Sequence, residues 1–448
     1  MHSASSTSGA TAPRVAIVGG GWAGMAAAMH WHGQGAQITV YEAARTLGGR
    51  ARSVPARLPD GRAVMLDNGQ HILVGAYRDC LALMRTVGLA PERLLLRMPL
   101  ALQYPDRSGL RMPDLPPPWD ALAGIAQARG WTWGERLALL QTAARWRLQG
   151  FCCAPEVTVR QLCQRLPRRL IDEFIDPLCV SALNTPAAEA SGAVFLRVLQ
   201  DSLFAGRGGS HLLLPRTDLG RLWPEAAADW LRARGCNVHL GRRVQGLAQR
   251  PAGGWTLLGV EGETGAAPPS YDTVVMACPS WETSRLVAGA SGLGAGDLQA
   301  AAHWCARADA LRFEAITTVY LWEPGVRLPL PMLSLRHSTQ EPAHFAFDRG
   351  QLDGPSGLMA FVISASSTDR GLLETQVLAQ ARRALGMFGV NRPQVVQTIV
   401  EKRATFACTP ALARPPRQIL PGLTACGDYV DGPYPATLEG AVRSALAP

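Results

Sequence analysis

The chain has 448 residues, of which 47% are hydrophobic, and it carries a formal net charge of +9 at pH 7. This length and composition exclude a largely disordered protein and predict two or three domains with sizeable cores. The charge comes almost entirely from arginine, and no basic run interleaved with aromatic residues indicates nucleic-acid binding.

The first segment, residues 1–13, is rich in Ser, Thr, Ala and Gly and predicts a disordered tail. It lacks the basic and apolar regions of a signal peptide. No apolar run elsewhere approaches the roughly 20 residues that a membrane-spanning helix needs. We therefore expect a cytoplasmic protein, at most peripheral to the inner face of a membrane.

Residues 15–42 carry the pattern of a dinucleotide-binding βαβ unit, in which an apolar strand runs into a glycine-rich turn and an Ala-rich helix. Gly19 permits the tight turn, Gly21 lets a pyrophosphate approach the backbone, and Gly24 lets helix and strand pack closely. Glu42 ends the second strand and is placed to accept hydrogen bonds from a ribose. An acid at this position disfavours the 2′-phosphate of NADP.

A second glycine motif, Gly48-Gly49-Arg50, follows directly. It resembles the second fingerprint of the large FAD family that holds the amine oxidases and the carotenoid desaturases. In that family Gly48 and Gly49 would bring the backbone close to the cofactor, and Arg50 would lie against the pyrophosphate or the flavin edge. Taken alone Arg50 would be a surface arginine, but its place after the first motif favours FAD.

The stretch from Leu115 to Arg147 predicts two helices with apolar residues at helical spacing. These residues are Trp119, Leu122, Ile125 and Ala126 in the first helix and Leu137, Leu140, Ala144 and Leu148 in the second. One interpretation is core packing. The other is an interfacial pair of helices beside a lipid entrance, with Trp131 and Trp133 at the level of the headgroups.

The ten cysteines are scattered, with no CxxC pair and no Cys/His spacing typical of a metal site. Cys152 and Cys153 are adjacent and would pair with each other only under strain. We expect reduced thiols in a reducing compartment, and neither zinc nor an iron–sulfur cluster.

Further elements of the cofactor domain come from later in the chain. A strand at residues 237–240 and a buried strand from Tyr271 are predicted to rejoin the first βαβ unit, and in the FAD family the backbone at Val244 would face the adenine. An apolar run then ends in Gly427-Asp428, where Asp428 would bond the ribityl or pyrophosphate part of FAD or would simply cap a turn.

A predicted helix follows Asp428, and it contains Glu439, Gly440 and Ala441. In the FAD family its N-terminus would aim the helix dipole at the flavin pyrimidine and stabilise negative charge on the reduced ring. We therefore expect these residues to contribute to cofactor binding.

These elements predict an α/β fold with a Rossmann-like FAD-binding domain of the glutathione-reductase type, made of residues 14–75, 206–285 and 416–448. An α+β substrate domain, residues 76–205 and 286–415, is expected to be inserted into it.

The segment Asp67-Asn68-Gly69-Gln70-His71, with residues 178–186 and 426–435, makes the chain resemble the hydroxysqualene dehydroxylases, also called squalene-associated FAD-dependent desaturases. The resemblance covers nearly all of residues 14–448. In the wider family the first segment passes beneath the flavin ring, so Asn68 and Gly69 would contact FAD.

This resemblance implies reductive dehydroxylation of hydroxysqualene, a C30 isoprenoid, to squalene for hopanoid synthesis. Protonation of the allylic hydroxyl would release water, and hydride from reduced FAD would quench the cation, with an electron donor that the sequence does not identify. His71 and Asp67 are the candidate proton donors, and Tyr434 is a third. Structural alternatives are a turn cap for Asp67, a packed ring for His71 and an aromatic wall of the flavin pocket for Tyr434.

Two enzyme alternatives use the same scaffold in the oxidative direction, a phytoene-type carotenoid desaturase and an amine oxidase. An amine oxidase usually needs a lysine near the flavin, and Lys402, the only lysine, lacks a suitable context. A prenyl-lipid escort protein would resemble this fold without flavin, but the intact glycine motifs disfavour it. The oligomeric state is not predicted.

Overall fold

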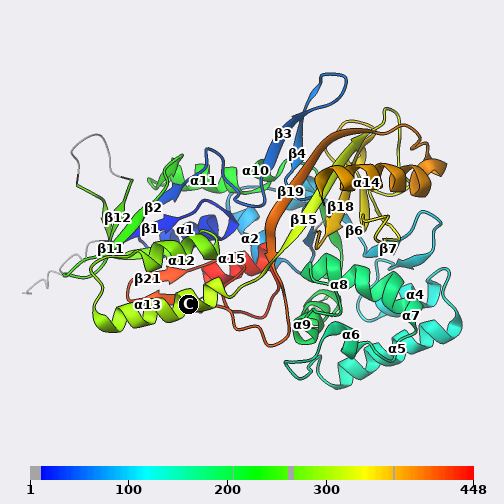
Figure 1. The fold of residues 1–448 in the computed structure, drawn as a ribbon, viewed down its shortest axis with the longest axis horizontal. Helices are drawn as coiled ribbons and strands as arrows, with labels where there is room; N and C mark the ends of the chain where they lie inside the picture. The colour runs from blue at the N-terminus through cyan, green and yellow to red at the C-terminus, as the bar shows by residue number, and fades with distance from the viewer. Residues whose placement is uncertain (1–11, 205, 261–266, 367–368, 448) are drawn as a thin grey trace, which may run out of the picture.

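The computed structural model describes residues 12–204, 206–260, 267–366 and 369–447, so most of the predicted tail lies outside the described residues. Figure 1 shows a nucleotide-binding part around β1 and β2, a second sheet beneath α14, and a group of helices that includes α4 and α5. The predicted α/β fold with a Rossmann-like domain and a substrate domain is confirmed.

A six-stranded sheet in the order β10-β2-β1-β14-β21-β20 forms the core of the first part. Its strands are β1 (Arg14–Val18), β2 (Gln37–Glu42), β10 (Asn237–Leu240), β14 (Thr273–Met276), β20 (Gln418–Leu420) and β21 (Leu423–Ala425). The neighbouring pairs from β10 to β21 are parallel, and β20 is antiparallel to β21. Val15 and Ile17 of β1 enter one hydrophobic core and Ala16 and Val18 enter another, which explains the uninterrupted apolar run.

Helices cover the face of the sheet that Val15 and Ile17 enter. These helices are α1 (Trp22–Gly33), α2 (Arg78–Thr86), α10 (Leu219–Leu222), α11 (Pro224–Arg232) and α15 (Leu438–Leu446). The helix α1 contacts α11 and α15, and α15 also contacts α2. Residues close to both ends of the chain therefore pack together in this layer.

A second group of elements extends the nucleotide-binding part. It contains β11 (Gly246–Gln249), β12 (Trp255–Leu258), β13 (Ser270–Tyr271), α12 (Ser280–Ala288) and α13 (Ala295–Asp309). The helix α13 lies within the segment predicted for the substrate domain, yet it packs against α12 and β20 of the nucleotide-binding part.

The second part is built on a five-stranded antiparallel sheet in the order β16-β17-β18-β15-β19. Its elements are β15 (Phe313–Trp322), β16 (Met332–Ser334), β17 (Phe345–Asp348), η2 (Arg349–Gln351), β18 (Leu358–Ser364), α14 (Arg370–Leu385), η3 (Gly386–Phe388) and β19 (Gln394–Phe406). On one face Val319, Leu321 and Phe361 pack against α14 in a separate core. The opposite face, with Phe345 and Phe347, belongs to the large core that reaches the first part.

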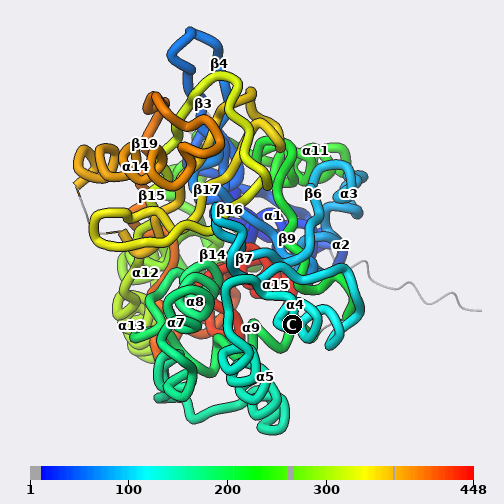
Figure 2. The backbone as a smooth tube through the Cα atoms, turned by 90° about the vertical axis from the view of Figure 1, so that its right-hand side faces the viewer, coloured from blue at the N-terminus to red at the C-terminus, as the bar shows by residue number. Residues whose placement is uncertain are grey.

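Helices close the molecule beside this sheet (Figures 1 and 2). They are α4 (Trp119–Gln127), α5 (Trp133–Leu148), α6 (Val159–Leu162), α7 (Arg168–Leu170), the π-helix η1 (Ile171–Ile175), α8 (Asp176–Leu183) and α9 (Gly192–Leu203). The short helix α3 (Pro91–Leu94) lies instead next to α2. In Figure 2 α5 lies at the lower edge, opposite the hairpin of β3 and β4. Within the described ranges, no helix combines the length and apolarity needed to cross a membrane.

Short strands complete the fold. They are β3 (Ser53–Arg57), β4 (Ala63–Asp67), β5 (Leu73–Val74), β6 (Leu95–Met98), β7 (Ala101–Gln103), β8 (Gly109–Arg111) and β9 (Leu212–Pro215). The β3–β4 hairpin ends at Asp67, and β5 begins at Leu73 and pairs with β9. These two elements hold residues 68–72 between them.

Candidate active site

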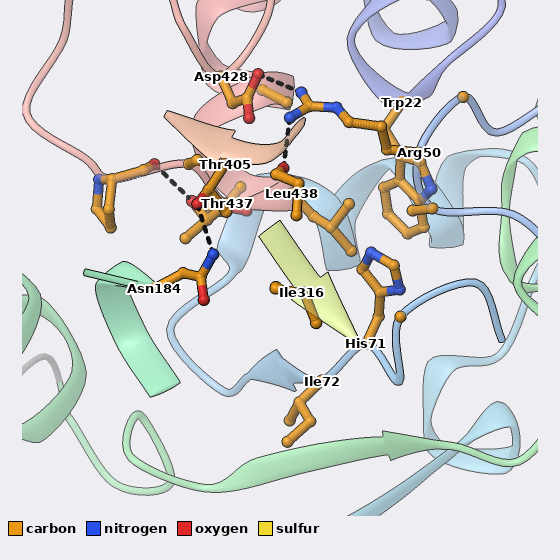
Figure 3. A pocket seen from close by; sticks show the side chains of 18 of the residues that line it. Trp22, Arg50, His71, Ile72, Asn184, Ile316, Thr405, Asp428, Thr437 and Leu438 are labelled. Carbon is orange, nitrogen blue, oxygen red and sulfur yellow. Dashed lines mark hydrogen bonds and ion pairs between the residues drawn. The ribbon is translucent and has the colours of Figure 1, made fainter. Parts of the chain in front are cut away.

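A cavity of about 770 Å³ opens at the carboxyl ends of β1 and β2 and extends to the sheet of the second part. Such strand ends are where α/β sheets bind nucleotides. Figure 3 shows the region around Arg50 and His71 from close by. Most of the predicted site residues line the cavity; Gly24, Asp67 and Gly440 do not.

The glycine-rich turn has the geometry of a phosphate cradle. Gly19 has φ +119°, and a Cβ on Gly24 would lie 1.9 Å from the Gly19 carbonyl oxygen, so only glycine permits this approach. A Cβ on Gly21 would instead meet nothing closer than 3.7 Å and would project into space that a ligand could use. The helix α1 begins here without a side-chain cap or an acidic residue in its first turn. Its positive end therefore suits a pyrophosphate.

Glu42 is fixed at the rim of this cradle. Its Oε2 accepts a hydrogen bond from the Gly20 N–H at 2.6 Å, and its Oε1 accepts one from the Ala44 N–H at 2.7 Å. Val244 lines the cavity as predicted, but the neighbouring Arg242 and Arg243, which sequence reasoning missed, line it as well. Their only signal is a basic pair directly after a predicted strand.

The Gly-Gly-Arg motif joins three distant segments. The Gly48 N–H donates to the Gly20 carbonyl at 3.0 Å, which ties the second glycine motif to the first. Arg50 donates to Asp428 Oδ1 at 2.5 Å and to the Ala404 carbonyl at 2.6 Å (Figure 3). The guanidinium thus connects the N-terminal unit to β19 and to the C-terminal segment. The predicted pair of cofactor ligands, Arg50 and Asp428, is therefore one ion pair at the cavity wall.

The C-terminal segment is held by contacts that the sequence did not indicate. Arg414 donates to the carbonyl oxygens of Asp428 at 3.2 Å and Tyr434 at 2.9 Å. The Gly427 N–H donates to the Ser444 hydroxyl at 2.8 Å. Gly427 and Asp428 both line the cavity, as expected of residues that contact a cofactor.

The three predicted residues of α15 have different places. Ala441 lines the cavity, whereas the Gly440 N–H is bound by the Thr437 hydroxyl, which caps the helix at 3.0 Å. The buried Glu439 carboxylate accepts hydrogen bonds from the backbone N–H groups of Asp79 and Cys80 at 3.1 and 3.0 Å. Although Glu439 borders the cavity, its carboxylate serves to fasten α15 to the first turn of α2.

The loop after β4 is organised by the Asp67 carboxylate. Its oxygens accept from the Gly69 N–H at 3.0 Å, the His71 N–H at 2.5 Å and the His71 ring Nδ1 at 2.8 Å. Burial acts to raise the pKa of Asp67, but the charge and hydrogen bonds of His71 outweigh it and lower the pKa below its usual value. Asp67 is therefore an ionised acceptor at neutral pH, which disfavours it as the proton donor.

His71 is the titratable ring that this loop presents to the cavity. Its side chain is 25% exposed, and in Figure 3 the ring lies across from Trp22 with Ile72 and Ile316 nearby. Because Nδ1 is taken by Asp67, the other nitrogen, Nε2, is left for a ligand, and no described residue hydrogen-bonds to it. Such an imidazole can carry and transfer a proton.

Tyr434 has a different setting. Its hydroxyl donates to Asp201 Oδ2 at 2.6 Å and accepts from Arg443 Nη1 at 2.5 Å, while the Arg197 guanidinium lies 5.6 Å from the ring centroid. Burial and the Asp201 carboxylate raise the pKa of Tyr434. Its proton is therefore committed to Asp201, a residue on α9 that sequence reasoning missed. These contacts favour a role for Tyr434 as an aromatic wall of the flavin pocket over a role as the proton donor.

Beyond His71 the cavity is mostly apolar. Its lining there comes from η1, α8 and α9 on one side and from the five-stranded sheet on the other: Phe174, Leu178, Val198, Leu199, Leu203, Ile316, Met332, Phe345, Phe347 and Val362. Asn184 ends α8 with φ +47°, and its side chain donates to the Thr405 hydroxyl at 2.9 Å. Lys402 is exposed on β19 and does not line the cavity.

Sequence relatives support this arrangement. Hydroxysqualene dehydroxylase from Rhodopseudomonas palustris is 27% identical over 446 residues, and the enzyme of the same name from Zymomonas mobilis is 25% identical over 442 residues; each comparison covers 96% of both chains. The predicted resemblance to these proteins is confirmed.

Solved structures share the fold. An oxidoreductase from Methanosarcina mazei superimposes with a TM-score of 0.70 at 14% identity, covering 97% of this chain and 99% of its own. Cyclohexylamine oxidase from Brevibacterium oxydans gives a TM-score of 0.66 at 17% identity, covering 97% of both chains.

The family model described as flavin containing amine oxidoreductase matches residues 22–447, which is nearly the whole described chain. The glycine cradle, the uncapped start of α1 and the Arg50–Asp428 wall fit FAD as the cofactor. The chain therefore belongs to the flavin containing amine oxidoreductase family and is an FAD-dependent oxidoreductase.

Proposed function

We propose that this oxidoreductase removes the hydroxyl group of hydroxysqualene reductively and forms squalene, the precursor for hopanoid synthesis. The observation that carries the proposal is the His71–Asp67 pair, a proton-transfer group beside the mostly apolar part of the cavity. The likeness to hydroxysqualene dehydroxylases along nearly the whole chain supports the choice of substrate.

The chemistry assigns a separate task to each wall of the cavity. An allylic hydroxyl leaves as water only after it accepts a proton, and His71 Nε2 is the donor that we propose. Asp67 fixes the ring through Nδ1 and leaves Nε2 for the substrate hydroxyl. Bound reduced FAD supplies the hydride, so that alcohol, proton and hydride give hydrocarbon and water. The apolar wall at Ile316 and Phe345 keeps water from recapturing the allylic cation.

Two observations weigh on the alternatives. Lys402 is exposed and does not line the cavity, which disfavours an amine oxidase that needs a lysine near the flavin. The long apolar lining would also accept a carotene, so a phytoene-type desaturase is distinguished only by its substrate and by the oxidation state of its flavin.

The test uses purified holoenzyme under anaerobic conditions. With dithionite-reduced FAD and hydroxysqualene we expect squalene, identified by mass spectrometry. In D₂O the product should gain one deuterium, because the N5 hydrogen of reduced flavin exchanges with solvent. Conversion of phytoene by oxidised holoenzyme, with no turnover of hydroxysqualene, would overturn the proposal in favour of a desaturase. A purified protein that stays colourless after reconstitution with FAD would favour the non-enzymatic alternative, a prenyl-lipid escort protein.

We place this activity in the cytoplasm. All ten cysteines are free, and all except Cys152 are buried or half-buried, which suits a reducing compartment. The physiological electron donor would have to reduce the flavin of this enzyme before each turnover.

A further inference from the structure

The helices α4 and α5 present an outward apolar face that the cavity does not use. On α5 the exposed apolar residues recur every four or seven positions, so they share one side of the helix. They are Trp133, Leu137, Ala144 and Leu148. Trp133 is 74% exposed and Leu148 is 89% exposed. The opposite side of α5 carries Leu139, Thr142 and Trp146, which are buried.

The helix α4 continues this face. Trp119 is 64% exposed and Leu122 is 39% exposed, three positions apart on the helix. Arg136 of α5 donates to the carbonyl oxygen of Ala126 at the end of α4 at 2.7 Å, and its guanidinium lies 4.6 Å from the centroid of the Trp133 ring. The start of α5 is thereby fastened to the end of α4. We call these exposed side chains the apolar face: Leu115, Trp119, Leu122, Trp133, Leu137 and Leu148.

The exposed charged residues along the same helices all carry a positive charge. Residues 115–150 are all described, and the charged residues that are exposed among them are Arg129, Arg145 and Arg147. The two acids in this range are not available to a partner, because Asp120 is buried and Glu135 is bound in the capping box with Thr132. A face of exposed tryptophan, leucine and arginine is typical of a helix that lies in the headgroup region of anionic lipids.

The apolar face is backed by the cavity wall. Trp131, which follows α4, packs edge-on against Phe174 with 5.5 Å between ring centroids, and Trp146 of α5 packs against Phe195 at 6.4 Å. Both phenylalanines line the cavity. On the inner side of the two helices, the buried Trp131 and Trp146 therefore each contact a phenylalanine that lines the space that would hold a lipophilic substrate.

We propose that the apolar face docks on an anionic phospholipid bilayer. The charge pattern favours this partner over a second copy of the chain, because a symmetric contact would place the arginines of the two copies against each other. The proposal concerns the surface alone and does not depend on which isoprenoid is converted.

The test measures co-sedimentation of the holoenzyme with phosphatidylcholine vesicles, with and without phosphatidylglycerol. We expect binding to the anionic vesicles. The triple variant W133Q/L137Q/L148Q should bind at least tenfold more weakly, since each large side chain contributes roughly tenfold when it leaves water. The double variant R145Q/R147Q should lose about fivefold per arginine on anionic vesicles only.

A matched control removes exposed apolar residues elsewhere. Leu298, Leu372 and Met387 are 54%, 50% and 73% exposed, and L298Q/L372Q/M387Q should bind like the wild type. FAD content and melting temperature establish that each variant is folded. The proposal is overturned if the wild type ignores anionic vesicles, or if the control variant loses binding equally. It is also overturned if ultracentrifugation shows a dimer that the triple variant converts to a monomer.

Discussion

His71 is the residue whose surroundings say most about the chemistry. Its ring is oriented by a carboxylate that is itself held by two backbone N–H groups, so the direction of Nε2 is set by the loop rather than by the ring's own torsions. A group fixed in this way loses little entropy when it meets a substrate hydroxyl.

Replacing His71 with glutamine should slow the formation of squalene while FAD remains bound. General acid catalysis contributes about 10²–10⁴-fold, and we expect a loss of that size in single-turnover rate. Rapid-quench measurements on reduced holoenzyme provide the rate, and the absorbance near 450 nm of the oxidised protein provides the FAD content. His303, exposed on α13, supplies the control variant H303Q. A rate equal to that of the wild type would remove His71 from the mechanism.

Replacing Asp67 with asparagine should change how stability depends on pH. The folded-state pKa of Asp67 lies below its unfolded value of about 3.8, so the ionised carboxylate stabilises the protein above that pH. This contribution is lost as the pH falls through the folded-state pKa. The gap in unfolding free energy between wild type and D67N, measured by urea titration, should be constant near neutral pH and narrow below about pH 4. D229N, at a 76% exposed acid, should show no such narrowing.

Some single residues could be predicted from the sequence and others could not. The fingerprint glycines and Glu42 act through local backbone geometry, so their spacing identifies them. Asp201 bonds Tyr434 from a helix more than 200 residues earlier, and Arg414 bonds it from a loop 20 residues earlier. Nothing in the local context of either residue distinguishes it from other charged residues.

At the scale of elements, the close contact between the turn after β1 and α1 depends on the absence of a Cβ at Gly24. The substitution Gly24→Ala would place a Cβ 1.9 Å from the Gly19 carbonyl oxygen, so the helix must move away from the turn. We expect FAD to be lost on gel filtration and the unfolding free energy to fall by about 1–3 kcal/mol, as for other overpacked sites.

The control for this prediction lies on the same helix. Gly33 ends α1 with no atom within 4 Å of an added Cβ, so Gly33→Ala should be neutral or stabilising by up to about 1 kcal/mol. Both variants are compared by chemical denaturation and by the ratio of flavin to protein absorbance. Equal effects of the two substitutions would contradict the role of Gly24 in packing.

The predicted helices of residues 115–147 show which features helical spacing predicts and which it does not. Helical spacing correctly indicates both α4 and α5. For Trp131 the structure bears out core packing and not the alternative of a lipid surface, because its side chain is 4% exposed and packs against Phe174. Phe174 follows in a π-helix more than forty residues later, and periodicity within one helix carries no information about such a partner.

At the scale of the whole molecule, the Arg50–Asp428 pair joins the beginning of the chain to its end. Asp428→Ala should leave the Arg50 guanidinium with one partner fewer at the cavity wall, at a cost of about 1–3 kcal/mol in unfolding free energy. We expect faster loss of FAD, which is measured as the fluorescence of the flavin that is released on dilution. Asp60→Ala, which removes the exposed pair with Arg62, is the matched control and should retain FAD. A D428A protein that stays fully yellow would contradict this.

The nucleotide-binding part was predictable in outline because the βαβ signal of residues 15–42 is local and strong. The three segments assigned to cofactor binding do supply the strands of one sheet. The place of α13 was not predictable, since its helical pattern gives no sign that it packs against β20 instead of the second sheet.

The packing of α1 against α15 also has a consequence for biosynthesis. The glycine cradle precedes its neighbour, residues 438–446, by most of the sequence, so it is synthesised well before that helix. Throughout that interval the nascent chain carries an uncovered apolar helix and a half-built nucleotide pocket. Stable capture of the flavin therefore has to wait until residues 438–446 have been made and have packed on α1.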